Sequence, residues 1–204
     1  MAEIITSEVQ TSGGPAQVVI EQPEGEPRLL VVLTHGAGGT PGTPDILAVR
    51  DAARGRGAVT ALVMQPYRVK GARAPGSAVK QDAAWAEVIA ALRAGTPGVP
   101  LVQGGRSNGA RVVCRTAREV SAAGVIALAF PLHPPGSPEK SRDAELRAAG
   151  TSVLVINGDR DPFGVPEPDD ATSVIVLSGE THALAKNPAA VGVAVAEWLD
   201  ALLS

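Results

Sequence analysis

The chain has 204 residues, 45% of them hydrophobic and 19% charged, which is ordinary for one compact globular domain. A formal charge of −3 and only 2% aromatic residues argue against binding to nucleic acid or to an anionic membrane surface. No apolar segment approaches the roughly 20 residues that cross a bilayer, and the first ten residues do not resemble a secretory signal. The lone Cys114 forms no disulfide within the chain. We expect a single cytoplasmic domain over residues 1–204.

The pattern of apolar residues predicts strands from the start of the chain. Residues 4–11 and 16–22 are strand candidates whose four-residue separation, Ser-Gly-Gly-Pro, predicts a hairpin. Six short runs rich in Val, Leu and Ile follow, as expected of strands buried on both faces of a sheet. These runs cover residues 29–33, 60–64, 99–102, 125–130, 153–156 and 174–177.

Helical patterns lie between several of these runs. The apolar stripes occupy positions 85, 88, 89 and 92, positions 110, 113, 114 and 117, and positions 191, 195, 198 and 202. Gly95 ends the first helix, while Asn187 and Pro188 begin the last one. The alternation predicts an α/β fold: a mostly parallel, twisted sheet of about eight strands with an antiparallel N-terminal hairpin and helices on both faces.

The strongest chemical signal is the pentapeptide Gly105-Arg106-Ser107-Asn108-Gly109, directly after one predicted strand and before a predicted helix. A G-x-S-x-G sequence in that context is a nucleophile elbow, in which a sharp turn exposes the serine. The glycines are needed because side chains at their positions would collide with the strand and the helix. The pentapeptide alone also occurs as an ordinary turn, so the context carries the prediction.

A serine nucleophile needs a base and an acid that orients the base. In α/β-hydrolases both follow the serine in the chain, at the ends of later strands. Of His35, His133 and His182, only His182 follows the last strand. Asp159 and Asp161 both leave the preceding strand; we predict that Asp161 is the acid, because Pro162 favours an extended backbone there, and that Asp159 is structural.

Acyl transfer also requires N–H donors for the developing oxyanion. The backbone groups of Asn108, after the nucleophile, and Ala37, in the glycine-rich loop after the strand at 29–33, occupy the expected places. A dinucleotide-binding loop is the rival interpretation of that loop, but Pro41 stands where its third glycine should be, and no P-loop lysine follows. There is no metal-binding motif, so we predict neither cofactor nor metal.

The segments LTHGAGG, GGRSNGAR, FPLHPPGSPEKSR and NGDRDPFG together resemble the KANL/Tex-type branch of α/β-hydrolases, which is similar to dienelactone hydrolases. The resemblance covers nearly the whole chain after Arg28 and implies the same fold and triad. In this branch a methionine and a glycine are more usual than Asn108 and Ala110. We also assign His35, His133 and Arg73 to substrate binding.

The predicted function is that of a serine hydrolase acting on an ester or thioester through an acyl-enzyme. Residues 131–151 leave no room for a large cap domain, so we expect an open cleft for a small acyl substrate. Arg68, Lys70 and Arg73 are predicted to rim that cleft and to favour anionic substrates. The alternative function is a catalytically idle scaffold or ligand-binding protein, and the chain is expected to be a monomer or a homodimer.

Overall fold

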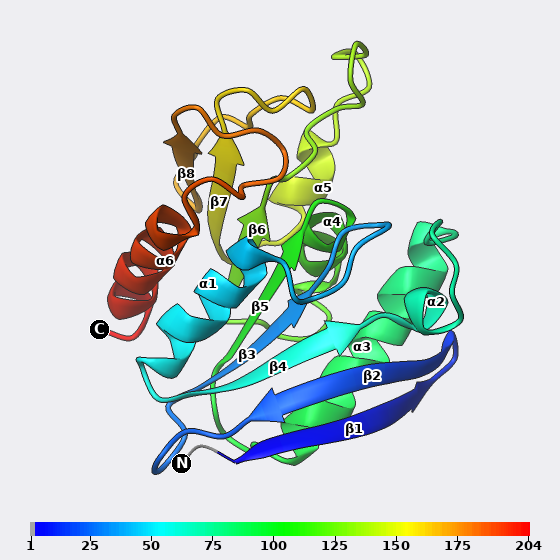
Figure 1. The fold of residues 1–204 in the computed structure, drawn as a ribbon, viewed down its shortest axis with the longest axis vertical. Coiled ribbons are helices and arrows are strands. Elements are labelled where there is room, and N and C mark those ends of the chain that lie inside the picture. The colour runs from blue at the N-terminus through cyan, green and yellow to red at the C-terminus, as the bar shows by residue number, and fades with distance from the viewer. Residues whose placement is uncertain (1–2) are drawn as a thin grey trace.

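The computed structural model describes residues 3–204 and contains one sheet of eight strands in the order β1-β2-β4-β3-β5-β6-β7-β8 (Figure 1). The N-terminal hairpin lies at one edge, and the remaining strands continue across the sheet. The strands are β1 (Ile4–Thr11), β2 (Gly14–Glu21), β3 (Leu29–Thr34), β4 (Ala58–Met64), β5 (Leu101–Arg106), β6 (Gly124–Leu128), β7 (Ser152–Gly158) and β8 (Thr172–Leu177).

The strand pairing confirms the predicted α/β-hydrolase arrangement. β1 pairs antiparallel with β2, and β2 pairs antiparallel with β4. Every later pair, from β4–β3 to β7–β8, is parallel. The carboxyl ends of β3 to β8 therefore meet at one edge of the sheet, which is where ligands bind in such folds.

Helices cover both faces of the sheet, as predicted. They are α1 (Pro44–Arg54), α2 (Pro66–Val69), α3 (Ala78–Ala94), α4 (Asn108–Thr116), α5 (Asp143–Arg147) and α6 (Pro188–Leu202). Alternate residues of β3 point to opposite faces, so Leu30 packs in a core cluster with residues of α3 and α4, and Val31 in one with residues of α1 and α6. In Figure 1, α1 and α6 lie side by side over the same face.

The sequence underestimates β5, which continues beyond the predicted end at residue 102 as far as Arg106. The extra residues are not apolar. Gln103 is completely buried, yet its amide oxygen accepts a hydrogen bond from Trp85 Nε1 (2.7 Å) and its amide nitrogen donates to the Val113 carbonyl (2.6 Å). Gly104 leaves space for Leu33, since a Cβ there would lie 2.7 Å from Leu33 Cδ2. Satisfied polar groups and close strand packing thus extend a strand that hydrophobicity alone cuts short.

The segment between β6 and α5 contains a loop and leads into one short helix, as the sequence predicts, and it adds no cap domain. Figure 1 shows this loop projecting past the end of the sheet. Within residues 3–204, no helix is long and apolar enough to cross a membrane.

Candidate active site

The turn between β5 and α4 holds Ser107 in the strained conformation of a nucleophile elbow. Its backbone has φ 53° and ψ −112°, a region that residues with a side chain rarely adopt. A Cβ at Gly105 would lie 2.4 Å from the carbonyl carbon of Gly109, and a Cβ at Gly109 would lie 2.6 Å from the His35 carbonyl oxygen. Both glycines of the pentapeptide are therefore required by space, and the turn presents the serine at the carboxyl edge of the sheet.

Ser107, His182 and Asp161 form one hydrogen-bonded row, although they come from loops after β5, β8 and β7. His182 Nε2 lies 2.9 Å from Ser107 Oγ, and its Nδ1 lies 2.8 Å from Asp161 Oδ2. The Asp161 side chain is completely buried, whereas 21% of the His182 side chain is exposed. The contact between Ser107 and His182 that chain order predicts is present. A neutral imidazole with Nδ1 protonated can donate to the carboxylate and accept from the hydroxyl.

The two aspartates of the loop after β7 have different surroundings. Asp161 Oδ1 accepts from the backbone N–H of Phe163 (2.9 Å), which leaves Oδ2 for His182. Asp159 Oδ1 accepts from the N–H of Gly179 (2.8 Å), in the loop after β8. Asp159 thus joins the two loops instead of stabilising its own turn, and only Asp161 reaches the imidazole.

The two backbone N–H groups expected to bind an oxyanion are free to do so. Among the described residues, neither Ala37 N nor Asn108 N donates a hydrogen bond to another protein group. Side chains fix both segments: Tyr67 Oη donates to the Ala37 carbonyl (3.0 Å), and Asn108 Nδ2 donates to Gln81 Oε1 (2.7 Å). Burial raises the pKa of Tyr67 to about 12, against the opposing charge of Arg68, so its hydroxyl remains a donor.

His35, which we assigned to substrate binding, is completely buried, and both of its ring nitrogens have partners within the protein, so that role stays a prediction. Its Nε2 accepts from the N–H of Gln65 (3.0 Å), after β4, and its Nδ1 lies 2.8 Å from the Gly36 carbonyl. Burial lowers the pKa of His35, and the positive charge of Arg68 lowers it further. The hydrogen bond to the Gly36 carbonyl acts in the opposite direction and raises the pKa, but burial has the larger effect. A neutral His35 therefore holds the glycine-rich loop against the end of β4.

Within residues 3–204, neither His133 nor Arg73 forms a hydrogen bond with Ser107 or His182. The half-buried His133 ring packs on Gly164, where a Cβ would lie 2.5 Å from Nε2, and its Nδ1 lies 2.9 Å from the Pro134 carbonyl. Arg73 is exposed on the loop after α2. The role of each in substrate binding stays a prediction.

Two of the three cations in the predicted basic rim donate hydrogen bonds to backbone carbonyls. Arg68 Nε donates to the carbonyl of Gly39 (3.0 Å), and its Nη1 donates to the carbonyl of Ala72 (3.0 Å). Lys70 Nζ donates to the carbonyl of Gly13 (2.8 Å), in the turn of the hairpin. Both side chains therefore fasten loops together, a role that the sequence did not indicate.

Sequence reasoning also missed the side chains that support His182. Arg106 Nη2 donates to the His182 carbonyl (2.8 Å), while its Nε lies 3.0 Å from the fully buried Asp45 Oδ2 as an ion pair. The Phe163 ring stacks on the imidazole with centroids 4.3 Å apart. Arg106 stands inside the pentapeptide, but only the fold reveals its partner 76 residues further along the chain.

Solved structures share this fold over nearly the whole chain at low sequence identity. An α/β serine hydrolase without a lid from Xanthomonas campestris is 19% identical, with a TM-score of 0.74 over 96% of this chain and 95% of that one. An α/β serine hydrolase homologue from Coxiella burnetii is 17% identical, with a TM-score of 0.76 over 96% and 97%. An esterase from Pyrobaculum calidifontis is 17% identical, with a TM-score of 0.69 over 98% and 84%.

The family is established by sequence as well as by fold. No curated protein matches the sequence. The model of the alpha/beta hydrolase domain, however, matches residues 27–186, which include the elbow, the acid loop and His182. Together with the eight-stranded sheet and the absence of a cap domain between β6 and α5, this match shows that the chain belongs to the alpha/beta hydrolase family.

Proposed function

We propose that this protein is a serine hydrolase that cleaves an ester or thioester of a small acyl group, with Ser107, His182 and Asp161 as its catalytic triad. The observation that carries the proposal is the continuous row of contacts from Ser107 Oγ through both ring nitrogens of His182 to Asp161. Structural neighbours that include serine hydrolases and an esterase support hydrolysis as the reaction class.

The reaction divides into two acyl transfers. Ser107 Oγ attacks the carbonyl carbon while His182 Nε2 takes the hydroxyl proton, and the N–H groups of Ala37 and Asn108 stabilise the oxyanion. His182 then gives its proton to the departing oxygen or sulfur, which leaves the acyl group on Ser107. Water attacks this acyl-enzyme with His182 again as base, and the acid and the free serine are released. No step in this scheme uses a cofactor or a metal.

Asp161 holds the imidazole with Nδ1 protonated and stabilises its positive charge in both transfers. The strained backbone at Ser107 supports its proposed role as the nucleophile. Strain of about 1–3 kcal/mol persists only where the surrounding structure enforces it, and it is concentrated at functional sites. The carboxylate side chain is completely buried, so water does not weaken its interaction with the ring.

A fluorophosphonate probe and an ester test the proposal directly. The wild type should be labelled and should hydrolyse p-nitrophenyl acetate, and Ser107→Ala should lose both properties. Ser173→Ala, an exposed serine on β8, is the matched control and should keep both. An unlabelled, inactive but folded wild type would favour the alternative, a catalytically idle scaffold.

Membership of the KANL/Tex-type branch and a cytoplasmic location complete the proposal. The branch rests on the motifs around Ser107, His133 and Asp161. A reducing compartment is consistent with Cys114, a completely buried thiol whose pKa is raised by burial despite the nearby charge of Arg115. Thiol and disulfide chemistry therefore have no part in the proposed reaction.

A further inference from the structure

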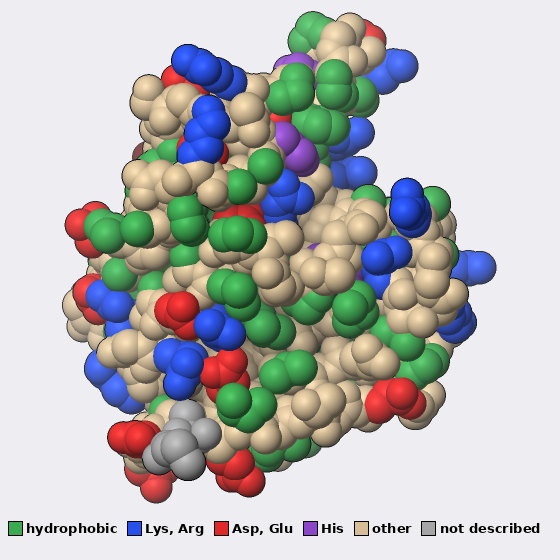
Figure 2. Space-filling view, in the orientation of Figure 1, with side chains coloured by type: hydrophobic (Ala, Val, Ile, Leu, Met, Phe, Trp, Pro, Cys, Tyr) green, Lys and Arg blue, Asp and Glu red, His purple; other side chains and the backbone are tan. Residues whose placement is uncertain are grey.

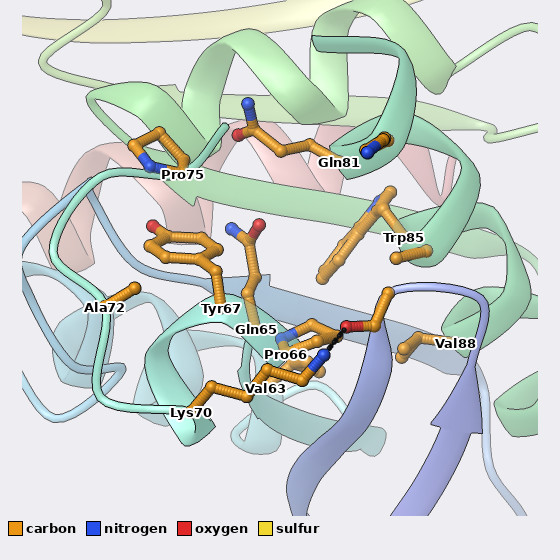
Figure 3. A pocket seen from close by; sticks show the side chains of 13 residues that line it. Val63, Gln65, Pro66, Tyr67, Lys70, Ala72, Pro75, Gln81, Trp85 and Val88 are labelled. Atoms are coloured by element: carbon orange, nitrogen blue, oxygen red, sulfur yellow. Dashed lines mark hydrogen bonds between the residues drawn. The ribbon is translucent and has the colours of Figure 1, made fainter. Parts of the chain in front are cut away.

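A hollow of about 220 Å³ lies between the end of β4, helix α2 with its following loop, the first turns of α3 and the β1–β2 turn (Figure 3). Its walls are largely apolar and include Val63, Pro66, Trp85 and Val88. Figure 3 shows Tyr67 and Trp85 on opposite sides of the hollow. None of the three proposed triad residues lines it.

Two residues that line the hollow are hydrogen-bonded to the segments that supply the proposed oxyanion donors. Tyr67, which lines the hollow, donates its hydroxyl to the carbonyl of Ala37. Gln81, on another wall, accepts from the side chain of Asn108, the residue after Ser107. A substrate carbonyl oxygen placed between Ala37 N and Asn108 N would therefore lie next to this hollow.

The sheet order assigns the hollow to one side of the substrate. β3 and β4 lie on one side of β5, which carries Ser107, whereas β6, β7 and β8 lie on the other side. His182 follows β8, and it must protonate the leaving group, so the leaving group lies toward β8. The hollow borders β4, and the group that points toward it is the acyl group.

We propose that the hollow is the acyl subsite and that it takes a compact, ring-sized apolar group. This proposal rests on the proposed function. A cavity of 150 Å³ lined by apolar side chains binds benzene, and about 220 Å³ holds a six-membered ring with its attached carbonyl but not a long lipid chain. Burial of such a ring removes apolar surface from water and orients the ester bond at Ser107.

The walls are fixed before any ligand binds. Trp85 Nε1 donates to the buried Gln103 amide (2.7 Å), which holds the indole in one orientation. Lys70 Nζ donates to Gly13 O (2.8 Å) and thereby fastens the hairpin turn to the loop after α2. A preformed apolar cavity loses little conformational entropy on binding, which favours a rigid group over a flexible chain.

Two variants that change the size of the hollow test this subsite. Ala72→Phe adds a ring at an exposed position on its wall, and Val88→Ala enlarges it from the buried side. For Ala72→Phe, kcat/KM for p-nitrophenyl cyclohexanecarboxylate should fall about tenfold or more relative to p-nitrophenyl acetate. Val88→Ala should shift the preference toward a bulkier 4-methylcyclohexanecarboxylate. Ala83→Phe, on an exposed position of α3 outside the hollow, is the matched control.

An unchanged ratio between the two esters in both variants, or an equal change in Ala83→Phe, would overturn the subsite. Binding separates this result from a failure of the proposed function. Calorimetry should detect methyl cyclohexanecarboxylate on Ser107→Ala and should lose it when Ala72→Phe is added. If the wild type hydrolyses no ester but this binding pattern holds, the hydrolase proposal fails and the apolar subsite stands. If Ser107→Ala does not bind the ester, the subsite is rejected.

Discussion

Asp161 uses its two carboxylate oxygens for two different tasks. Oδ1 accepts from the N–H of Phe163 and fixes the carboxylate, while Oδ2 contacts His182. An amide at this position would present an N–H group to the protonated Nδ1 or force the ring into the other tautomer. We therefore expect Asp161→Asn to lower kcat by about 10⁴, the magnitude seen for the same change in the serine-protease template, with the fold retained.

Asp159→Asn is the matched variant, two residues away in the same loop. The amide oxygen can still accept from the N–H of Gly179, so kcat should change little and the thermal midpoint should fall slightly. Measuring kcat and the thermal midpoint of both variants decides the assignment. A dead Asp159→Asn beside an active Asp161→Asn would reverse the two roles.

His35 gives the protein a pH dependence of stability. Burial lowers the pKa of His35 below the ordinary value of about 6.5 for a histidine, so the folded state keeps the ring neutral while the unfolded chain gains a proton below about pH 6.5. Neutral His35 therefore contributes its full stabilisation of the fold above pH 6.5. This contribution is lost as the pH falls from 6.5 toward the pKa of His35 in the folded protein, by at most about 1.4 kcal/mol per pH unit. Urea unfolding between pH 8 and pH 5 should show this decline.

Two variants, His35→Gln and His133→Gln, test whether His35 causes the loss of stability at acid pH. His35→Gln should be less stable at pH 8, because the contacts to Gln65 and Gly36 are weakened, but its stability should fall less between pH 7 and pH 5. His133→Gln removes a half-buried histidine of another loop and serves as the comparison. Equal slopes in the wild type and in His35→Gln would show that other groups cause the acid sensitivity.

At the scale of elements, Arg106 connects three parts of the fold. It stands at the end of β5, its ion pair reaches Asp45 in the first turn of α1, and its hydrogen bond holds the carbonyl of His182. We expect Arg106→Met to lower kcat by at least about tenfold with little change in KM, since a displacement of about 1 Å at a catalytic group can cost a hundredfold. Steady-state kinetics and the thermal midpoint measure the two effects separately.

Arg111→Met is the control for the loss of a half-buried arginine. In the wild type, the Arg111 guanidinium makes two hydrogen bonds to Glu145 (2.8 and 2.7 Å). These bonds join α4 to α5 and do not involve His182. Burial opposes ionisation of Glu145, but the hydrogen bonds and charges of Arg111 and Arg115 lower its pKa overall. This variant should lose stability and keep kcat. If both arginine variants lower kcat equally, Arg106 has no specific effect on the histidine.

How far the sequence predicts these elements depends on the range of the interactions that define them. The central strands β3 to β7 are recognised because both of their faces are buried, whereas β8 at the sheet edge is only partly buried. The last helix is recognised because Asn187 Oδ1 caps it at Ala190 N (3.2 Å). The proposed triad follows from chain order along a sheet whose strand directions are predictable. Contacts such as Tyr67 to Ala37 and Gln81 to Asn108 join residues 30 and 27 positions apart with no local pattern, so they required the folded structure.

For the whole molecule, the net charge of −3 conceals a local excess of positive charge. Figure 2 shows several lysine and arginine side chains gathered over the region of α2 and the loop that follows. Arg68 and Lys70 hold backbone carbonyls there, whereas Arg73 and Lys80 are exposed and form no ion pair within residues 3–204. We therefore expect an anionic substrate in this region to meet Arg73 and Lys80 first.

The effect of these two cations can be measured by pairing an anionic ester with a neutral one of the same length. Lys80 lines the proposed acyl subsite and Arg73 stands on the adjoining loop. A unit charge about 4 Å away in water contributes roughly 1 kcal/mol, or about fivefold in binding. The double variant Arg73→Gln with Lys80→Gln should raise KM for mono-p-nitrophenyl glutarate several-fold and leave KM for p-nitrophenyl valerate unchanged.

Two controls show whether electrostatic attraction is the cause. Added salt should shrink the difference between the two esters in the wild type, because a Debye length of about 8 Å at physiological ionic strength screens exposed charges. Lys140→Gln removes another exposed cation that does not line the hollow, and should leave both KM values as they are. Equal rises of KM for glutarate and valerate would reject selection by charge, because a purely electrostatic contact distinguishes the carboxylate from the methyl group that replaces it.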